Sequence, residues 1–290
     1  MSTIFKKIID REIPADHVYL MTGFAPDTSL LAATATRNQA PYKAVLTHGW
    51  VLDERGKVYS KSEIAKAKAA GAKLDYVDPG EWMQKNGAEL LRLWTAASDY
   101  QADVVFSKAI LDQLSESYRK VRNTARILAA NLYDFDPASD MVPAAGLEPV
   151  DRYILARYAG VAQKVRADYD AFNFQGVVHA INAFATVDLS AFYVDVTKDR
   201  LYTFGASSKA RRAGQTAMYI MVDGLARMLA PILPVTAEQL WKALPGGRDA
   251  SVHLAEFPSA QSLQALVDEP LVAEWQRLLA LRDRANGEIE

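Results

Sequence analysis

A short loop in the first third of the chain carries residue types that bind phosphate groups. Its sequence is Gly56-Lys-Val-Tyr-Ser-Lys-Ser62, in which one serine hydroxyl lies on each side of Lys61. An ammonium group and two hydroxyl donors can bind phosphate oxygens, and the glycine gives the backbone the freedom to close over a nucleotide. Ser60, Lys61 and Ser62 are therefore candidate nucleotide-binding residues. On residue types alone, a solvated surface turn is the more common role of such a stretch.

A row of basic residues is the second candidate site. It consists of Arg119, Lys120, Arg122 and Arg126. The three arginines are spaced i, i+3 and i+7, so a helix would present them along one face, where they could follow a nucleic-acid backbone. The alternative is a solvated face whose cations pair with Glu116 and Asp112. A second basic cluster is interpreted mainly as surface, and it consists of Lys209, Arg211 and Arg212.

Composition narrows the chemistry further. The 290 residues contain 33 Lys and Arg against 35 Asp and Glu, a net charge of -2, so nucleic-acid binding requires a local basic patch. No cysteine is present, which excludes disulfides, thiol catalysis and Cys-ligated zinc, and we expect no metal site. The start lacks the apolar core of a signal peptide, and no later stretch approaches about 18 uncharged apolar residues. We therefore expect a cytoplasmic protein that binds no membrane.

Two kinds of structure must position these residues. Up to about residue 80 the chain has short apolar runs between turn signals, and the run Lys43–Leu52 predicts one strand or hairpin arm. From Pro79 onward the apolar period is helical. We predict helices at about 107–132, 149–170, 174–197, 206–230, 235–244 and 268–286. Six helices with short joints predict a mainly α fold, a helical bundle.

Several side chains of the predicted bundle have a structural interpretation. The spacing of Thr236-Ala-Glu-Gln239 is that of a capping box and predicts that a helix begins there. His179 and His253 have no obvious partner and are interpreted as structural. The aromatic residues at helical spacing are interpreted as core and not as base-stacking groups. They are Phe172, Phe174, Phe184, Phe192, Tyr193, Tyr219, Trp241 and Trp275.

Several motifs, taken in order, resemble one protein family. The run Ala40–Asp53 precedes the loop that ends at Ser62, and Asn86–Trp94 and Ser98–Tyr100 follow it. Further motifs lie at 117–126, 131–137, 151–155, 172–174, 188–193 and 229–234. Their order and spacing resemble the C-terminal half of a class I isoleucyl-tRNA synthetase, from the signature-loop region to the anticodon-binding helical bundle. The resemblance covers roughly residues 30–286.

The resemblance implies a domain organisation and a partner. It implies a truncated remnant of a Rossmann-like nucleotide-binding fold at residues 1–94, a small α/β element that carries the Ser-Lys-Ser loop. An anticodon-binding helical bundle would follow at residues 95–290. The implied partner is tRNA, whose acceptor side lies near the helix of Arg119, Lys120, Arg122 and Arg126 in the family.

The resemblance also implies roles for the loop residues. In the family this loop closes on Mg-bound ATP during formation of the aminoacyl-adenylate. Ser60, Lys61 and Ser62 would bind ATP, and Lys61 would be the catalytic residue that stabilises charge on the phosphates. Val58 and Tyr59 replace a Lys-Met pair of the family. Lys57, one place before the expected lysine, is a further candidate ATP-binding residue.

Other parts of the family pattern are missing. No two histidines have the His-x-Gly-His spacing that binds ATP phosphates in the family, and only Gly23 and Asp27 remain of a run that helps to hold the adenylate. The zinc-bearing C-terminal module common in the family has no counterpart here, because there are no cysteines. These departures indicate a fragment that cannot aminoacylate alone.

Residues 2–19 resemble the opening of the histidine-triad nucleotide hydrolases. That family requires a His-x-His-x-His cluster, which this chain lacks. The hydrolase activity therefore does not carry over, and a fusion, a borrowed leader and a mispredicted gene start remain alternatives.

Three functions follow from these observations. The first is a tRNA-binding, isoleucyl-tRNA-synthetase-like piece without autonomous aminoacylation. The second is one part of a split isoleucine-tRNA ligase, in which a separate N-terminal synthetase chain completes an ATP-dependent enzyme. The third is a structural or regulatory helical bundle that binds no RNA.

Overall fold

The chain forms two compact units. The computed structural model describes residues 18–20, 33–40, 44–58, 64–66, 69–71 and 78–289. One unit comprises residues 1–77 and 98–107, and the other comprises residues 78–97 and 108–290. The predicted domain boundary between residues 94 and 95 falls inside helix α5, Ala88–Ala97, which belongs to the second unit.

Two short parallel strand pairs lie in the first unit. Strand β1, Val18–Leu20, pairs with β2, Ala44–Leu46, and β3, Val51–Leu52, pairs with β4, Val104–Val105. Parallel strands need long connections, which is the topology of α/β structure. The prediction of one strand or hairpin arm over Lys43–Leu52 is wrong in treating the run as a single element, because Ala44–Leu46 and Val51–Leu52 belong to two separate sheets.

A close backbone approach explains the break between β2 and β3. The Gly49 N–H donates to the Tyr100 carbonyl at 2.9 Å, and the Trp50 N–H donates to the Asp103 carboxylate at 2.6 Å. A Cβ at Gly49 would lie 2.2 Å from the carbonyl oxygen of Ala102, so no side chain fits at this position. Partners more than fifty residues away therefore end the strand, and the local apolar pattern contains no sign of them.

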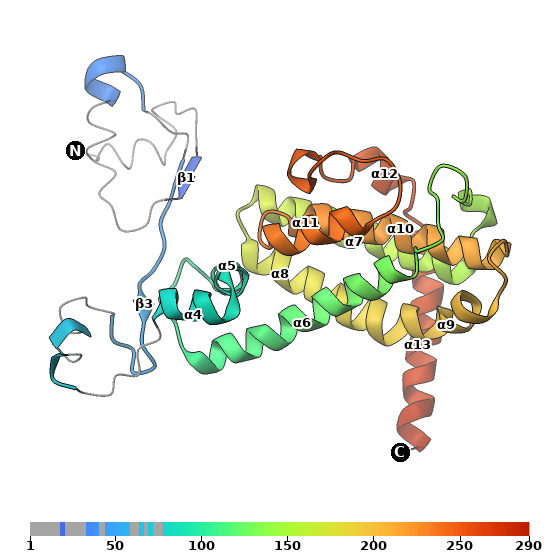
Figure 1. The fold of residues 1–290 in the computed structure, drawn as a ribbon, viewed down its shortest axis with the longest axis horizontal. Helices are drawn as coiled ribbons and strands as arrows, with labels where there is room; N and C mark the ends of the chain where they lie inside the picture. The colour runs from blue at the N-terminus through green and yellow to red at the C-terminus, as the bar shows by residue number, and fades with distance from the viewer. Residues whose placement is uncertain are drawn as a thin grey trace. The chain divides into compact units, whose positions relative to one another are not determined.

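In the part of the chain that the structure describes, every regular element of the second unit is a helix, as Figure 1 shows. Its longer helices are α4 (Pro79–Asn86), α5, α6 (Lys108–Ala130), α7 (Pro149–Asp170), α8 (Phe174–Ala183), α9 (Val194–Thr203), α10 (Lys209–Leu229), α11 (Pro234–Ala243) and α13 (Glu269–Ile289). A π-helix, η2 (Phe184–Tyr193), joins α8 to α9. The shorter elements are η1 (Ala144–Gly146), η3 (Val252–Leu254) and α12 (Ala260–Gln264). The predicted mainly α bundle and its six helices are confirmed, except that the helix predicted to end at residue 197 continues to Thr203.

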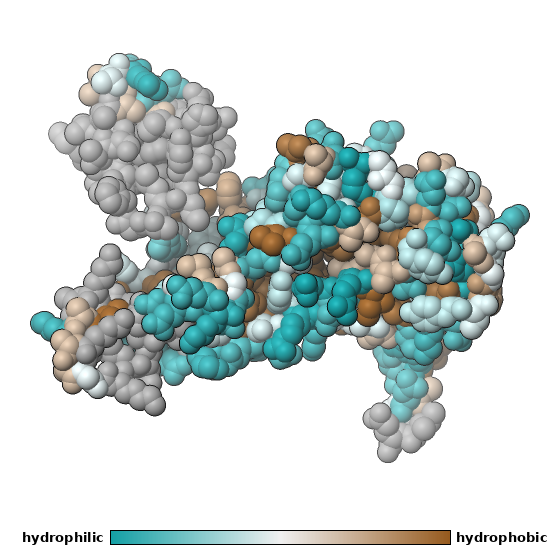
Figure 2. All heavy atoms as spheres, viewed as in Figure 1, coloured by the Kyte–Doolittle hydropathy of each residue, from teal (hydrophilic) through white to brown (hydrophobic). Residues whose placement is uncertain are grey.

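Helices α7 and α10 form the centre of the bundle. Met218, Met221 and Val222 of α10 have no exposed surface, nor do Ile154 and Val165 of α7. Helices α6 and α8 pack against α7 and α10 and complete this core. Figure 1 shows the four helices side by side. Polar residues cover most of the visible outer face of the helical unit in Figure 2, as expected of a bundle whose apolar stripes face inward.

The run from α8 through η2 to α9 is long and apolar enough to cross a membrane by length and composition alone. An 18-residue window within Phe174–Thr203 has a mean hydropathy of 1.4, with 44% of it buried inside the bundle. Leu189 and Tyr193 are fully buried, and Asp188 forms an ion pair with Arg157 of α7 at 3.1 Å. These contacts are those of a core helix, so burial within the bundle accounts for the apolar composition.

The start of α11 differs from the predicted capping box. The helix begins at Pro234, and Thr236 lies inside it, 7% exposed. The backbone N–H groups of Val235 and Thr236 donate to the Glu89 carboxylate at 2.7 and 2.9 Å, and the Thr236 hydroxyl donates to the same group. The prediction is wrong because a carboxylate from α5 supplies the cap that a residue of the local sequence usually supplies.

Replacing Glu89 by alanine should destabilise the helical unit by about 1–2 kcal/mol, which is the usual cost of losing a helix cap. The loss leaves two N–H groups at the start of α11 without an acceptor. Urea unfolding measures the effect, with the exposed Glu81→Ala on α4 as the matched control. Equal stability of the two variants would contradict the capping role of Glu89.

Candidate nucleic-acid interface

Helix α6 presents the predicted basic row to solvent. Its inner face packs into the bundle through Leu111, Val121 and Leu128, which are at most 9% exposed. On the outer side all four predicted residues are exposed. They are Arg119, Lys120, Arg122 and Arg126. The row is thus accessible, and its role in binding RNA stays a prediction.

The ion pairs of α6 leave most of the row unneutralised. Arg119 pairs with Glu116 at 2.8 Å, as the alternative interpretation expects, but Asp112 pairs with Lys108 at 2.5 Å. Among the described residues, the other three cations of the row form no ion pair. They are Lys120, Arg122 and Arg126. An incoming anion would therefore meet three charges with no competing carboxylate within 4 Å.

Most of the predicted ATP loop lies outside the described residues. This is true of Ser60, Lys61 and Ser62, of Gly23 and Asp27, and of residues 2–17 in the hydrolase-like opening. Lys57 is described: its side chain is exposed, and its N–H donates to the Asp53 carboxylate at 2.8 Å. Gly56, with φ +76°, closes the turn before it. The ATP-binding roles stay predictions.

The second basic cluster is mostly buried, which contradicts its interpretation as surface. Arg211 is 4% exposed and donates to both carboxylate oxygens of Asp134, at 2.6 and 3.0 Å. Arg212 donates to the Asp134 carbonyl at 2.7 Å and faces Asp140 at 3.4 Å. Only Lys209 is exposed. The segment 131–137 supplies the acceptors, so these two arginines attach it to α10 and are not free to bind RNA.

The Asp134 ion pair should make the helical unit sensitive to acid. The hydrogen bond from Arg211 lowers the pKa of Asp134 from its ordinary value of 3.8, so the folded state binds this proton less readily than the unfolded state. The ion pair therefore contributes stability above pH 4, and that contribution is lost as the pH falls through the lowered pKa. We expect wild type to be more stable than Asp134→Asn at pH 6, with the difference narrowing below pH 3.8. Thermal unfolding from pH 2.5 to 6 measures it, and a constant difference would contradict this origin.

The helical unit contains a second buried ion pair, between Asp151 and Arg200, which the sequence analysis did not predict. Asp151 has no exposed surface, and its carboxylate accepts hydrogen bonds from Arg200, at 2.9 Å, and from the Tyr193 hydroxyl, at 2.6 Å. Burial, together with the Asp151 charge, raises the pKa of Tyr193 well above its ordinary value, so the hydroxyl stays protonated and donates. Asp151 and Tyr193 lie in quoted motifs, but nothing in the local pattern pairs them with Arg200.

The predicted aromatic residues of the bundle, apart from Phe172, are core or pack against it. Phe184, Phe192, Tyr193 and Trp241 are at most 9% exposed. Phe174, Tyr219 and Trp275 are half-buried and pack against the core. Phe172, with φ +57°, is half-buried at the turn between α7 and α8, where its ring lies edge-on to Phe174 at 6.3 Å.

The described histidines have exposed side chains. They are His48, His179 and His253. His179 lies beside a pocket of the helical unit, and His253 contributes its backbone N–H to Ser251. No group of three His, Asp or Glu side chains that could hold a metal ion occurs in the described ranges. The structural interpretation of His179 and His253 stays a prediction.

Comparison with protein families identifies both parts of the chain. The family described as tRNA synthetases class I (I, L, M and V) matches residues 21–107, and the anticodon-binding domain of tRNA ligase matches residues 151–290. The chain therefore belongs to the class I aminoacyl-tRNA synthetases, as a synthetase segment followed by an anticodon-binding domain.

Curated relatives specify the enzyme within this class. The chain is 45% identical over 259 residues to the isoleucine–tRNA ligase of Geobacillus kaustophilus and 44% identical over 259 residues to that of Moorella thermoacetica. It is 42% identical over 263 residues to the enzyme of Natranaerobius thermophilus. These alignments cover 89–91% of this chain and 27% of each relative. The chain thus corresponds to a portion of isoleucine–tRNA ligase. The family resemblance is confirmed, while the matched share is 27% and not the expected half.

Solved structures share the fold. The LeuRS of Agrobacterium radiobacter, solved in a ternary complex with tRNA and LeuAMS, has a TM-score of 0.56 to this chain at 19% sequence identity. The superposition covers 88% of this chain and 29% of the LeuRS chain. The methionyl-tRNA synthetase of Mycobacterium tuberculosis has a TM-score of 0.52 at 15% identity and covers 73% of this chain and 40% of its own.

Proposed function

We propose that the chain binds tRNA through the exposed basic face of α6 and does not aminoacylate alone. The observation that carries this proposal is the set of three exposed cations on α6 that have no ion pair among the described residues. The anticodon-binding family match and the tRNA in the LeuRS complex support tRNA as the partner. A cytoplasmic location is part of the proposal, because tRNA is charged and used there.

The geometry of the face suits a nucleic-acid backbone. Arg119 and Arg126 are seven residues apart, which is about 10 Å along a helix. Cations along that length can contact successive phosphates of one strand, and each contact releases bound counterions from the RNA. The net charge of -2 gives no general attraction to RNA, so this local patch must supply the electrostatic affinity.

Alanine at Lys120, Arg122 and Arg126 together should weaken binding of an isoleucine tRNA at least about tenfold at low salt, because three phosphate contacts are lost. Fluorescence anisotropy with a labelled transcript measures the affinity. The control carries alanine at three exposed cations elsewhere in the helical unit, Lys209, Arg277 and Arg284, and so changes charge by the same amount. Equal loss in both variants would leave only general electrostatics and contradict a site on α6.

The split-enzyme alternative is supported by the match to the synthetase segment in a chain that spans 27% of its relatives. ATP use is a property of that class, and in this proposal Lys61 binds the phosphates together with Ser60, Ser62 and Lys57. We expect no ATP–pyrophosphate exchange with isoleucine from the chain alone. Exchange that appears only with an added upstream synthetase fragment, and disappears in Lys61→Ala, would select this alternative. Exchange at an ordinary synthetase rate by the chain alone would contradict the main proposal.

A further inference from the structure

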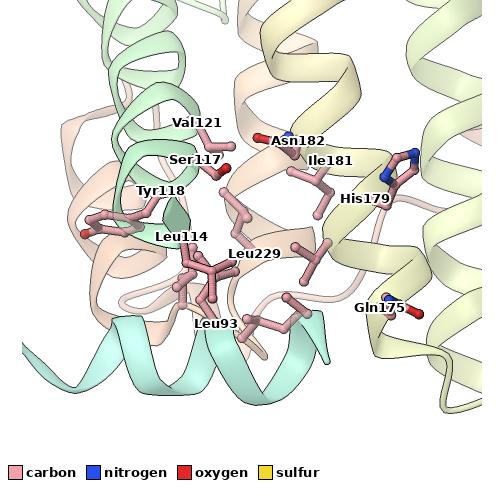
Figure 3. A pocket seen from close by; sticks show the side chains of 14 residues that line it. Leu93, Leu114, Ser117, Tyr118, Val121, Gln175, His179, Ile181, Asn182 and Leu229 are labelled. Atoms are coloured by element: carbon pink, nitrogen blue, oxygen red, sulfur yellow. The ribbon is translucent and has the colours of Figure 1, made fainter. Parts of the chain in front are cut away.

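The helical unit contains a pocket between α5, α6, α8 and the end of α10. Its volume is about 210 Å³. Figure 3 shows apolar side chains from all four helices in its wall, among them Leu93, Leu114, Ile181 and Leu229. An apolar cavity of about 150 Å³ accommodates a benzene ring, so this pocket is large enough for a small heteroaromatic ring.

Two polar groups at one end of this pocket have no partner. The side-chain oxygen of Asn182, on α8, is buried and makes no hydrogen bond with any described residue. The Ser117 hydroxyl, on α6, also makes no hydrogen bond within the described ranges. Figure 3 shows the two side chains pointing toward each other across the pocket. Buried acceptors are almost always hydrogen-bonded in folded proteins, so the Asn182 oxygen is available to a donor that enters the pocket.

The charge of the surroundings favours a ligand attached to a phosphate. None of the described residues in the pocket wall is an Asp or Glu, so no carboxylate among them repels an anion. Lys120 lies three residues after Ser117 on α6, which places it on the same side of the helix, and it is exposed without an ion pair. Gln175 and His179, both exposed, line the pocket on the α8 side and add polar contacts.

We infer that this pocket binds one unstacked nucleobase of an RNA, with an amino or imino N–H of the base donating to the Asn182 oxygen. Every nucleobase carries such a donor, and proteins commonly bind single bases that have left the stack of an RNA. Lys120 contacts the adjoining phosphate, and the apolar wall contacts the faces of the ring. The inference rests on the proposed function, because it assigns a base-binding pocket, lined in part by α6, to the same RNA partner.

Asn182→Leu tests the inference, because leucine has a similar size and no hydrogen-bonding group. The variant should weaken binding of an isoleucine tRNA about tenfold, whereas its melting temperature should stay the same or rise, since an unpaired buried acceptor is removed. Ser117→Ala is a second, smaller change with the same expected direction. The matched control is Asn286→Leu, at an exposed position of α13 outside the pocket. Unchanged tRNA affinity in both pocket variants, while the Lys120/Arg122/Arg126 variant remains weak, would overturn the pocket and leave the proposed function intact.

Mononucleotides test the pocket without reference to tRNA. Adenosine and cytidine 5′-monophosphate are titrated into the full chain while the side-chain amide signal of Asn182 is followed by NMR. A saturable shift of this signal that is absent in Ser117→Ala/Lys120→Ala supports the inference even if the wild-type chain fails to bind tRNA. No shift at millimolar nucleotide overturns it.

Discussion

Replacing Arg200 by methionine is expected to lower the free energy of unfolding by about 3–5 kcal/mol, the cost of leaving a buried charge without its partner. The Asp151 carboxylate has no exposed surface and would lose both hydrogen bonds from the guanidinium group. Of the donors that the described residues supply, only the Tyr193 hydroxyl would remain. Urea unfolding monitored by circular dichroism gives the free energy from the midpoint and slope.

A neighbouring ion pair provides the control. Lys198 and Asp195 lie on the same helix, α9, at 2.8 Å, with more than half of each side chain exposed. Lys198→Met should therefore cost much less stability than Arg200→Met, as the loss of a surface ion pair does. The double variant Asp151→Leu/Arg200→Met should recover much of the lost stability, since no charge stays buried. An Arg200→Met variant as stable as Lys198→Met would contradict the burial argument.

Replacing Trp241 by alanine should cost about 3–5 kcal/mol, as is typical of a buried tryptophan. The ring is 1% exposed and makes cation–π contacts with two guanidinium groups, Arg227 at 4.9 Å and Arg248 at 4.5 Å from the ring centroid. Its indole N–H donates to the Asp249 carbonyl at 2.8 Å. The alanine variant would lose the apolar burial and both cation–π contacts and leave a cavity beside the two arginines.

Two further variants separate these contributions to the stability. Trp241→Phe keeps an aromatic ring beside the arginines and loses the indole N–H, so it should cost clearly less than the alanine variant. Trp275→Ala removes a half-buried ring stacked on Tyr153 at 5.1 Å and should also cost less. The same urea unfolding measurement applies. Equal costs for Trp241→Ala and Trp275→Ala would show that burial and the arginine contacts of Trp241 contribute little.

The regular parts of the bundle were predictable because their signals are local. Helix α7 was predicted at 149–170 and runs from Pro149 to Asp170, with a proline at its first turn and an apolar period that faces α10. The basic row of α6 was found in the same way, since residues at i, i+3 and i+7 share a helix face. In both cases the neighbours in sequence are also the neighbours in space.

Three of the errors involve partners distant in sequence. Arg211 looked like a surface cation, but Asp134, far along the chain, buries it, and Glu89 replaces the predicted local cap at Thr236. The strand predicted over Lys43–Leu52 breaks where Gly49 meets the Tyr100 carbonyl. The unpaired oxygen of Asn182 has no sequence signal, because the lack of a partner is a property of packing. The spacing of residues in one sequence predicts which side chains share a helix face, but it does not predict which faces pack against each other.

The salt dependence of tRNA binding tests the central claim most directly. Association constants of the wild-type chain with an isoleucine tRNA are measured from about 50 to 200 mM salt, and log K is plotted against log salt. Three phosphate contacts on α6 predict that this slope is about -2 to -3 or steeper for the wild-type chain. When Lys120, Arg122 and Arg126 are replaced by alanine, the slope should become less negative by about 2–3. No binding at low salt, or a slope that the triple variant leaves unchanged, would contradict tRNA binding through this face.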